Sequence, residues 1–297
     1  MAWLTESGPV SAHTRAVGAM AFPCYLVTGE RAALVDGAIS SAAPLLEEHF
    51  GPGKLTPAWV LLTHTHYDHV GGLGLLRRLL PGLQVAGSAV AAATLEKPRV
   101  REFVLRMNRQ EEGMYGLAQV WGDREVPLEP EDLRVDRVLR DGEHLDLGAG
   151  VRVQALEAPG HTRCSMVYLV EPDRLLVGGE ALGAYVSPDE VQAQSVSSFR
   201  EYVASLERLA GLELEAIALP HHGVRTGADA RSHIPVALET ARRFRARVRE
   251  LHAQGLAPAA LAAALTGELR HGLSAGQPEK AFQLNLEAMI RAVLEER

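Results

Sequence analysis

The chain of 297 residues is long enough to bury a large core, as one domain or as a domain with an appendage. Its composition, 47% hydrophobic and 23% charged, excludes a disordered or fibrous protein. The net charge of −7 disfavours a dedicated nucleic-acid-binding protein, because the overall field repels polyanions. Two cysteines, Cys24 and Cys164, form no disulfide framework, and the sequence has neither a secretory signal nor an apolar span of roughly 18 residues. We therefore expect a cytoplasmic protein that does not enter a membrane.

Short strands punctuated by Gly and Asp begin at residue 22 and continue to about residue 220. Residues 22–37 read as a hairpin, because two apolar runs are joined by the turn signal TGER. A short helix is expected next, with Ser41 as its N-cap. The run PAWVLLT is continuously apolar, which is typical of a strand buried on both faces. A helix over 71–82 and a strand over 83–88 follow.

Residues 95–122 interrupt this rhythm and predict a helical insertion, with Val100, Phe103, Val104 and Met107 at helical spacing. After residue 234 the whole pattern is helical. This order predicts a layered α/β sandwich over residues 1–234 and a C-terminal helical region over residues 235–297. The remaining strands are expected at 133–139, 144–148, 151–158, 165–171, 173–179 and 215–220, with a helix over 198–212.

The segment LLTHTHYDHVGG, residues 61–72, carries three histidines and an aspartate within six positions. His64 and His66 are two apart at the end of a strand, so both imidazoles leave the same face and can reach one cation. Asp68 and His69 lie in the following turn and can serve a second cation. A plain surface turn is a poor alternative, because clustered imidazoles without a ligand repel one another on protonation. Imidazole and carboxylate together suit zinc, iron or manganese.

Three later strand ends carry further potential ligands. His161 follows one strand, Glu180 follows another, and the pair His221 and His222 follows the last buried strand. Functional residues of α/β folds gather at one edge of the sheet, at the ends of strands. Four strand ends with histidines or carboxylates therefore predict a single site.

The pattern His-x-His-x-Asp-His, a later histidine, a Gly-Gly-acid step and a terminal Pro-x-His-Gly resemble the metallo-β-lactamase fold hydrolases over about residues 20–225. The resemblance implies an αββα sandwich that holds two metal ions. It implies His64, His66 and His161 as ligands of one ion, and Asp68, His69 and His222 as ligands of the other. It also implies a carboxylate at position 180 that bridges the ions, and an aspartate, Asp36, beneath the site.

Two positions depart from the family pattern. The bridging residue is usually aspartate, whereas this chain has Glu180, whose longer side chain leaves open whether it bridges two ions or only contacts a ligating histidine. Position 221 is usually glycine. Because Gly223 keeps the His-Gly step, His222 aligns with the ligand, and His221 is expected to line the pocket or to support a ligand. Which of the two histidines is the ligand stays open.

More loosely, the chain resembles the pseudomonad quinolone-signal response thioesterase type, through residues 22–40, the segment RMNRQ and the helical tail. That resemblance implies C-terminal helices that partly cover the active site. Whether they close a pocket or form a homodimer contact stays open. The arginine-rich segment of residues 242–249 predicts a solvated helix face over a buried stripe of Phe244, Val248 and Leu251. A site for coenzyme A phosphates or for an acidic partner is the alternative.

These features together predict a hydrolase with two divalent metal ions, zinc in the first place and iron or manganese as alternatives. Two cations that share a water lower its pKa from about 15.7 towards 7, and Asp68 can accept its proton. The favoured substrate is a small-molecule thioester or ester such as an acyl-CoA. The alternatives are a phosphodiesterase or ribonuclease, and a metal-binding regulatory protein with a weakened site.

Overall fold

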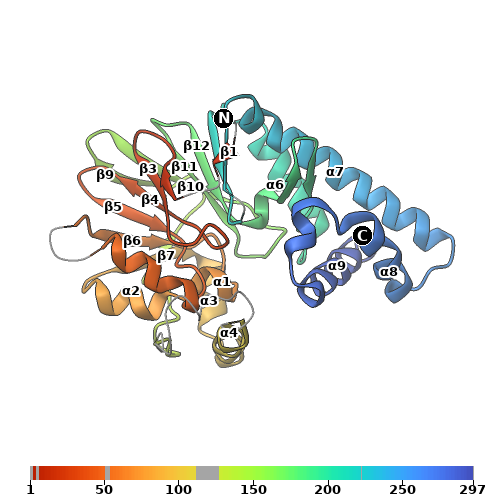
Figure 1. The fold of residues 1–297 in the computed structure, drawn as a ribbon, viewed down its shortest axis with the longest axis horizontal. Helices are drawn as coiled ribbons and strands as arrows, with labels where there is room; N and C mark the ends of the chain where they lie inside the picture. The colour runs from red at the N-terminus through yellow and green to blue at the C-terminus, as the bar shows by residue number, and fades with distance from the viewer. Residues whose placement is uncertain (1–2, 5–6, 51–53, 112–126, 222, 297) are drawn as a thin grey trace.

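Two β-sheets packed face to face, with helices on both outer faces, form the centre of the molecule (Figure 1). The computed structural model describes residues 3–4, 7–50, 54–111, 127–221 and 223–296. The first sheet has seven strands in the order β2-β3-β4-β5-β6-β7-β8. These are β2 (Gly8–Pro9), β3 (Thr14–Val17), β4 (Cys24–Thr28), β5 (Ala32–Val35), β6 (Pro57–Leu61), β7 (Gln84–Ser88) and β8 (Arg137–Leu139).

The second sheet also has seven strands, in the order β1-β16-β15-β12-β11-β10-β9. A separate two-stranded sheet, β13-β14, lies after β12 in the chain. The bounds are β1 (Trp3–Leu4), β9 (His144–Gly148), β10 (Val151–Glu157), β11 (Met166–Val170), β12 (Leu175–Gly178), β13 (Ala184–Ser187), β14 (Glu190–Gln192), β15 (Ala216–Ala218) and β16 (Val224–Thr226).

The helices divide between the two outer faces. Those of the first half cover the first sheet: η1 (Ser40–Glu48), α1 (Tyr67–Val70), α2 (Leu73–Leu79), α3 (Ala89–Leu95) and α4 (Pro98–Glu111). The later ones cover the second sheet and extend beyond it (Figure 1): η2 (Glu180–Leu182), α6 (Phe199–Leu209), α7 (Ala228–Ala253), α8 (Pro258–Leu269), η3 (Gly272–Gly276) and α9 (Glu279–Leu294). The expected αββα sandwich with C-terminal helices is therefore confirmed.

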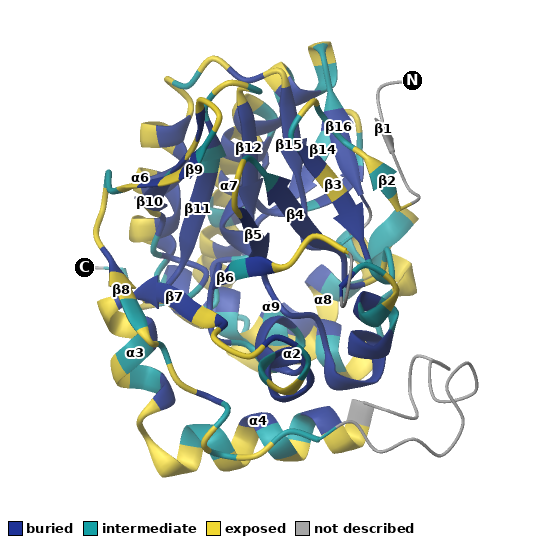
Figure 2. Cartoon of the chain, turned by 90° about the vertical axis from the view of Figure 1, so that its left-hand side faces the viewer, coloured by how far each residue is buried: buried dark blue, intermediate teal, exposed yellow. Residues whose placement is uncertain are grey.

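Three apolar layers hold these elements together, and the strands are the most deeply buried part (Figure 2). The layer between the sheets includes Leu61, Val153 and Tyr168. On the second sheet's outer face, Phe199 and Phe244 lie in the layer that joins the strands to the C-terminal helices. The predicted stripe of Phe244, Val248 and Leu251 is buried, which confirms that face of α7.

The predicted hairpin is present as the antiparallel pair β4 and β5. The short helix after it is a 3-10 helix, and Ser41 is not its N-cap, because the helix begins at Ser40 after Ile39 with no side-chain cap. In the insertion, α4 is helical as predicted, but Phe103 is 44% exposed and only Val104 of the four expected apolar positions is fully buried. Residues 112–126 lie outside the described part of the chain.

The boundary expected at residue 234 falls inside α7, which begins at Ala228 and continues without a break to Ala253. The division into two regions therefore stays a prediction. Within the residues described, no helix is long and apolar enough to cross a membrane.

Candidate metal centre

The motif LLTHTHYDHVGG lies where β6 ends and the chain bends into α1 and α2. The two sheets meet at this point, because Met166 N–H donates to the Thr63 carbonyl at 2.7 Å and the Tyr168 hydroxyl donates to the Leu62 carbonyl at 2.7 Å. His66 then caps α1, and its carbonyl accepts from His69 N–H at 3.0 Å. The bend carries Asp68 and His69 back beside the strand end.

The two glycines of the motif allow close backbone approach. Both have ordinary helical angles, with φ of −61° and −83°, so neither is needed for a left-handed turn. A Cβ on Gly71 would lie 2.2 Å from Asn108 Oδ1, and one on Gly72 would lie 2.1 Å from the Gly37 carbonyl oxygen. A side chain on Gly71 would push the motif away from α4, and one on Gly72 would push it away from the segment that precedes η1.

One group of potential ligands consists of His64, His66 and His161. His161 follows β10 and faces the strand end of β6, so that its Nε2 lies 3.2 Å from Nδ1 of His66. The ring of His64 packs edge-on to both, at centroid distances of 4.4 and 4.9 Å. Three imidazoles thus converge on one point from two different strand ends.

The second group consists of Asp68, His69, Glu180 and His221. His221 follows β15, and its Nε2 lies 3.1 Å from Glu180 Oε1 and 3.6 Å from Asp68 Oδ2. His69 Nε2 lies 3.4 Å from the same Glu180 oxygen. Within each group the ligand atoms all lie within 4.8 Å of one another.

Glu180 lies between the two groups. Its Oε1 faces His69 and His221, whereas its Oε2 lies 3.5 Å from His64 Nε2 and 3.7 Å from His161 Nε2. The carboxylate is held there by η2, which starts at Glu180 directly after β12. One oxygen of the side chain therefore faces each group.

Three of the histidines are oriented by an acceptor on their other ring nitrogen. Asp36 Oδ2 lies 2.8 Å from Nδ1 of His69 and also accepts from the Thr63 hydroxyl. Nδ1 of His161 lies 2.6 Å from the Gln194 carbonyl, and Nδ1 of His221 lies 2.6 Å from the Ala21 carbonyl. Each acceptor favours the tautomer with the ring proton on Nδ1, so that in the neutral ring the Nε2 lone pair faces the cluster.

The histidines of the two groups differ in the direction in which the site shifts their pKa. Burial lowers the pKa of His64 well below its usual value, and burial together with His161 lowers the pKa of His66 to about 4. Burial also lowers the pKa of His161. These three rings are therefore neutral at pH 7, which is the form that binds a metal.

In the second group the pKa of each histidine is raised. Burial by itself would lower the pKa of His69, but the carboxylates of Asp36, Glu180 and Asp68 outweigh it and raise that pKa well above the usual value. Burial by itself would also lower the pKa of His221, but the Glu180 carboxylate outweighs it and raises that pKa above the usual value. Without a cation, protons are the positive charge that balances the carboxylates.

Divalent metal ions fit this cluster. His64 Nε2, His69 Nε2 and Glu180 Oε2 are buried and make no hydrogen bond to any residue that the structure describes. Buried polar atoms are ordinarily paired, and leaving three in one place is costly unless a cation takes their lone pairs. Groups of three and four imidazole and carboxylate donors match the coordination of zinc and neighbouring transition metals.

The structure brings six of the seven expected ligands together: His64, His66, Asp68, His69, His161 and Glu180. The seventh, His222, lies outside the described residues. His221, which was expected to line the pocket or to support a ligand, places its Nε2 in the second group. Asp36 lies beneath the site as expected. The acceptors at Gln194 and Ala21 are backbone carbonyls, so no residue type marked them in the sequence.

A sandwich of two sheets between helices, with a histidine and carboxylate cluster at the strand ends, has the architecture of a metal-binding class of α/β proteins. The model of the Metallo-beta-lactamase superfamily matches residues 22–221, and the chain belongs to this superfamily, whose members are generally hydrolytic metalloenzymes.

Individual relatives are distant. The chain is 27% identical to the metallo-beta-lactamase fold-containing protein ST1585 of Sulfurisphaera tokodaii over 227 residues, which cover 71% of this chain and 78% of that protein. It is 30% identical to the hydroxyacylglutathione hydrolase of Acidiphilium cryptum over 197 residues, 65% of this chain and 60% of that protein. Among solved structures, the metallo-beta-lactamase family protein TTHA1429 of Thermus thermophilus aligns with a TM-score of 0.59 and 26% identity, covering 92% of this chain and 87% of that one.

Proposed function

We propose that the protein is a hydrolase with two divalent metal ions that cleaves a thioester or ester of a small molecule. The observation that carries the proposal is the position of Glu180, with one carboxylate oxygen directed to each of two groups of ligands. A carboxylate in this position could hold an ion on each side, which a single-metal site would not require.

The proposed ligands of the first ion are His64, His66 and His161, and those of the second are Asp68, His69 and His221, with Glu180 shared. Zinc is the proposed metal, because a mixed histidine and carboxylate set of this size is common for it. Bound cations would supply Lewis-acid polarisation of the acyl oxygen and a lowered pKa for a coordinated water.

The residues of the chain then divide the remaining work. The carboxylate of Asp68 accepts a proton from the attacking water. As the new C–O bond forms and the C–S or C–O bond to the leaving group breaks, the same carboxylate returns that proton to the leaving sulfur or oxygen. Asp36 and the Gln194 carbonyl keep His69 and His161 in position.

A thioester is favoured over other substrates by one relative. The hydroxyacylglutathione hydrolase of Acidiphilium cryptum acts, by its name, on an acylated glutathione, and it shares 30% identity with this chain over the aligned residues. The negative net charge of −7 disfavours the phosphodiester alternative.

The test is release of free thiol from acyl-CoA and acyl-glutathione thioesters by zinc-reconstituted protein. His66→Ala removes one proposed ligand, whereas His252→Ala changes an exposed histidine near the end of α7 and serves as the matched control. We expect turnover in the wild type and in His252→Ala, and a loss of at least about 100-fold in His66→Ala. Equal rates in all three proteins would overturn the proposal.

A further inference from the structure

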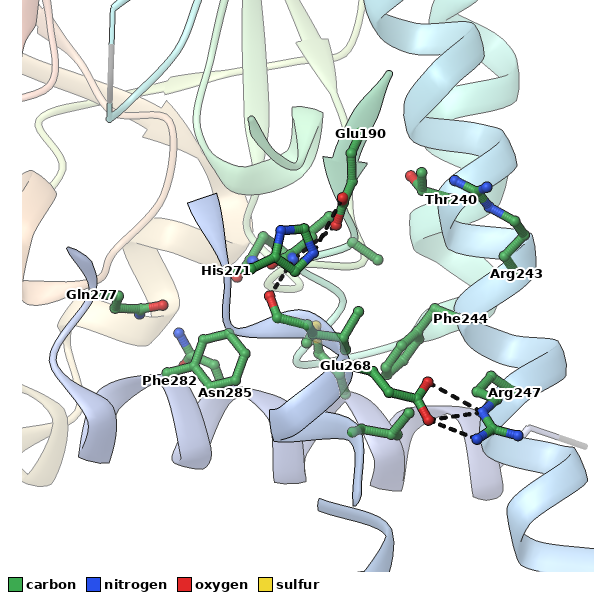
Figure 3. Close-up of a pocket in the computed structure, with 16 residues that line it drawn as sticks. Glu190, Thr240, Arg243, Phe244, Arg247, Glu268, His271, Gln277, Phe282 and Asn285 are labelled. Atoms are coloured by element: carbon green, nitrogen blue, oxygen red, sulfur yellow. Dashed lines mark hydrogen bonds and ion pairs between the residues drawn. The ribbon is translucent and has the colours of Figure 1, made fainter. Parts of the chain in front are cut away.

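A cavity of about 370 Å³ lies between β14 and the helices α7, α8 and α9, and none of the proposed metal ligands that the structure describes lines it (Figure 3). This volume is within the range of small-molecule sites, roughly 300–1,000 Å³. Its apolar wall is built by Phe244 of α7, Leu265 of α8, and Phe282 and Met289 of α9. The C-terminal helices therefore enclose a space in addition to packing on the sandwich.

The charged side chains at this cavity already have partners of opposite charge or hydrogen-bonding partners within the protein. Arg247 Nη2 lies 2.6 Å from Glu268 Oε1, and both appear joined in Figure 3. Glu190 accepts from the Gln192 amide at 3.0 Å and lies 3.3 Å from His271. Arg243 has a partner in Glu239 at 4.0 Å and is mostly exposed. A strongly charged ligand would meet no uncompensated opposite charge here, so the cavity suits an uncharged one.

Three carboxamide groups at the cavity are different, because they have hydrogen-bonding capacity to spare. The side chains of Gln194, Gln277 and Asn285 make no hydrogen bond to any other part of the chain that the structure covers. Figure 3 shows those of Gln277 and Asn285 directed toward one another beside the Phe282 ring. A carboxamide both donates and accepts, so such groups pair with amides of a ligand.

The cavity adjoins the metal centre through one residue. Gln194 lines the cavity, and its backbone carbonyl accepts from Nδ1 of His161 at 2.6 Å. A ligand in contact with Gln194 is therefore separated from the proposed metal ligand His161 by Gln194 alone.

We propose that this cavity binds an uncharged aliphatic chain that carries amide groups, the chemistry of the pantetheine arm of an acyl thioester. Phe282, Phe244 and Met289 contact its methylene stretches, and the carboxamides of Asn285 and Gln277 pair with its amides. The inference deepens the proposed function and rests on it for the identity of the reacting group, but the binding itself does not require hydrolysis.

The test is calorimetric binding of pantetheine to the metal-free full-length protein, with 6-mercaptohexanol as an amide-free thiol for comparison. Asn285→Leu and Gln277→Leu remove one carboxamide each at similar side-chain volume. Gln283→Leu makes the same change on the exposed side of α9 and is the matched control. We expect pantetheine to bind more tightly than 6-mercaptohexanol, and its Kd to rise about 5- to 10-fold in each cavity variant but not in the control.

A second readout uses octanoyl-pantetheine as substrate. The cavity variants should raise KM with little change in kcat, because they remove binding contacts remote from the reacting carbonyl. The idea fails if pantetheine binds no better than 6-mercaptohexanol, or if neither cavity variant differs from Gln283→Leu. Tight, variant-sensitive binding in a protein without thioesterase activity would instead keep the cavity assignment and remove the proposed function.

Discussion

The carboxylate of Asp36 lies 2.8 Å from Nδ1 of His69, and it also accepts from the backbone N–H and the hydroxyl of Thr63. Asp36 holds this position with a backbone φ of 61°, a left-handed conformation that is unfavourable for most residues other than glycine and asparagine or aspartate. This conformation, which aspartate adopts more readily than most residues, directs the Asp36 carboxylate to a potential metal ligand.

Replacing Asp36 by Asn should weaken metal binding. An amide opposite Nδ1 of His69 would donate rather than accept if its nitrogen faces the ring, and His69 would then carry its proton on Nε2, where the metal must bind. We expect the affinity for the second zinc ion to fall about 10- to 100-fold, measured by competition with a chromophoric chelator. An unchanged affinity for both ions would show that Asp36 only supports the fold.

The assignment of His221 rather than its neighbour can be decided by metal content. His221→Ala removes the Nε2 that lies 3.1 Å from Glu180, whereas His222→Ala leaves the described cluster intact. After dialysis against limiting zinc, elemental analysis should find about two ions per chain in His222→Ala and about one in His221→Ala. The reverse result would restore the alignment based on the His-Gly step.

Gly160 precedes the ligand His161 and should tolerate no side chain. Its φ is 131°, and an added Cβ would lie 2.2 Å from both Cα and N of Tyr202. Gly142 also has a positive φ, 77°, but an added Cβ there would meet open space. Alanine at Gly142 therefore measures the backbone strain without the steric clash. We expect Gly142→Ala to lower the free energy of unfolding by about 1–2 kcal/mol and Gly160→Ala by about 3 kcal/mol or more. Equal losses in urea denaturation would mean that α6 moves aside at no cost.

Protonation of His233 should lower the free energy of unfolding in mild acid. The ring is fully buried, its Nε2 donates to the Leu182 carbonyl at 2.9 Å, and its Nδ1 faces Arg225 Nη1 at 3.3 Å. Burial and the nearby Arg225 lower its pKa to about 4. The unfolded state, with a pKa near about 6.5, therefore binds the proton first, and the free energy of unfolding falls as the pH drops from about 6.5 towards 4.

The measurement is chemical denaturation of the wild type and His233→Gln at pH 7 and pH 5. Between these pH values the wild type should lose about 2 kcal/mol more than the variant, since glutamine does not titrate. Parallel losses in the two proteins would assign the acid sensitivity to other groups, such as the buried histidines of the metal-free cluster.

Much of the fold could be predicted because its signals are local. The apolar run that becomes β6, the turn between β4 and β5 and the helical periodicity of α6 each depend on neighbours a few residues away. The short strands β1, β2, β3, β13, β14 and β16 were missed, because strands of two to four residues carry too little pattern. Ser41 was misassigned as an N-cap because the hydroxyl of a buried 3-10 segment resembles a cap in sequence.

The sequence by itself determined the chemistry of the site: the spacing of His64, His66, Asp68 and His69 allows an elbow at a strand end to present several metal ligands at once. Only the tertiary structure decided how the distant parts meet. It directed His221 to Glu180, placed the carbonyls of Gln194 and Ala21 behind His161 and His221, and enclosed the cavity between α7, α8 and α9. The physical reason is that backbone carbonyls and helix packing act through space, and neither leaves a residue type at a fixed spacing along the chain.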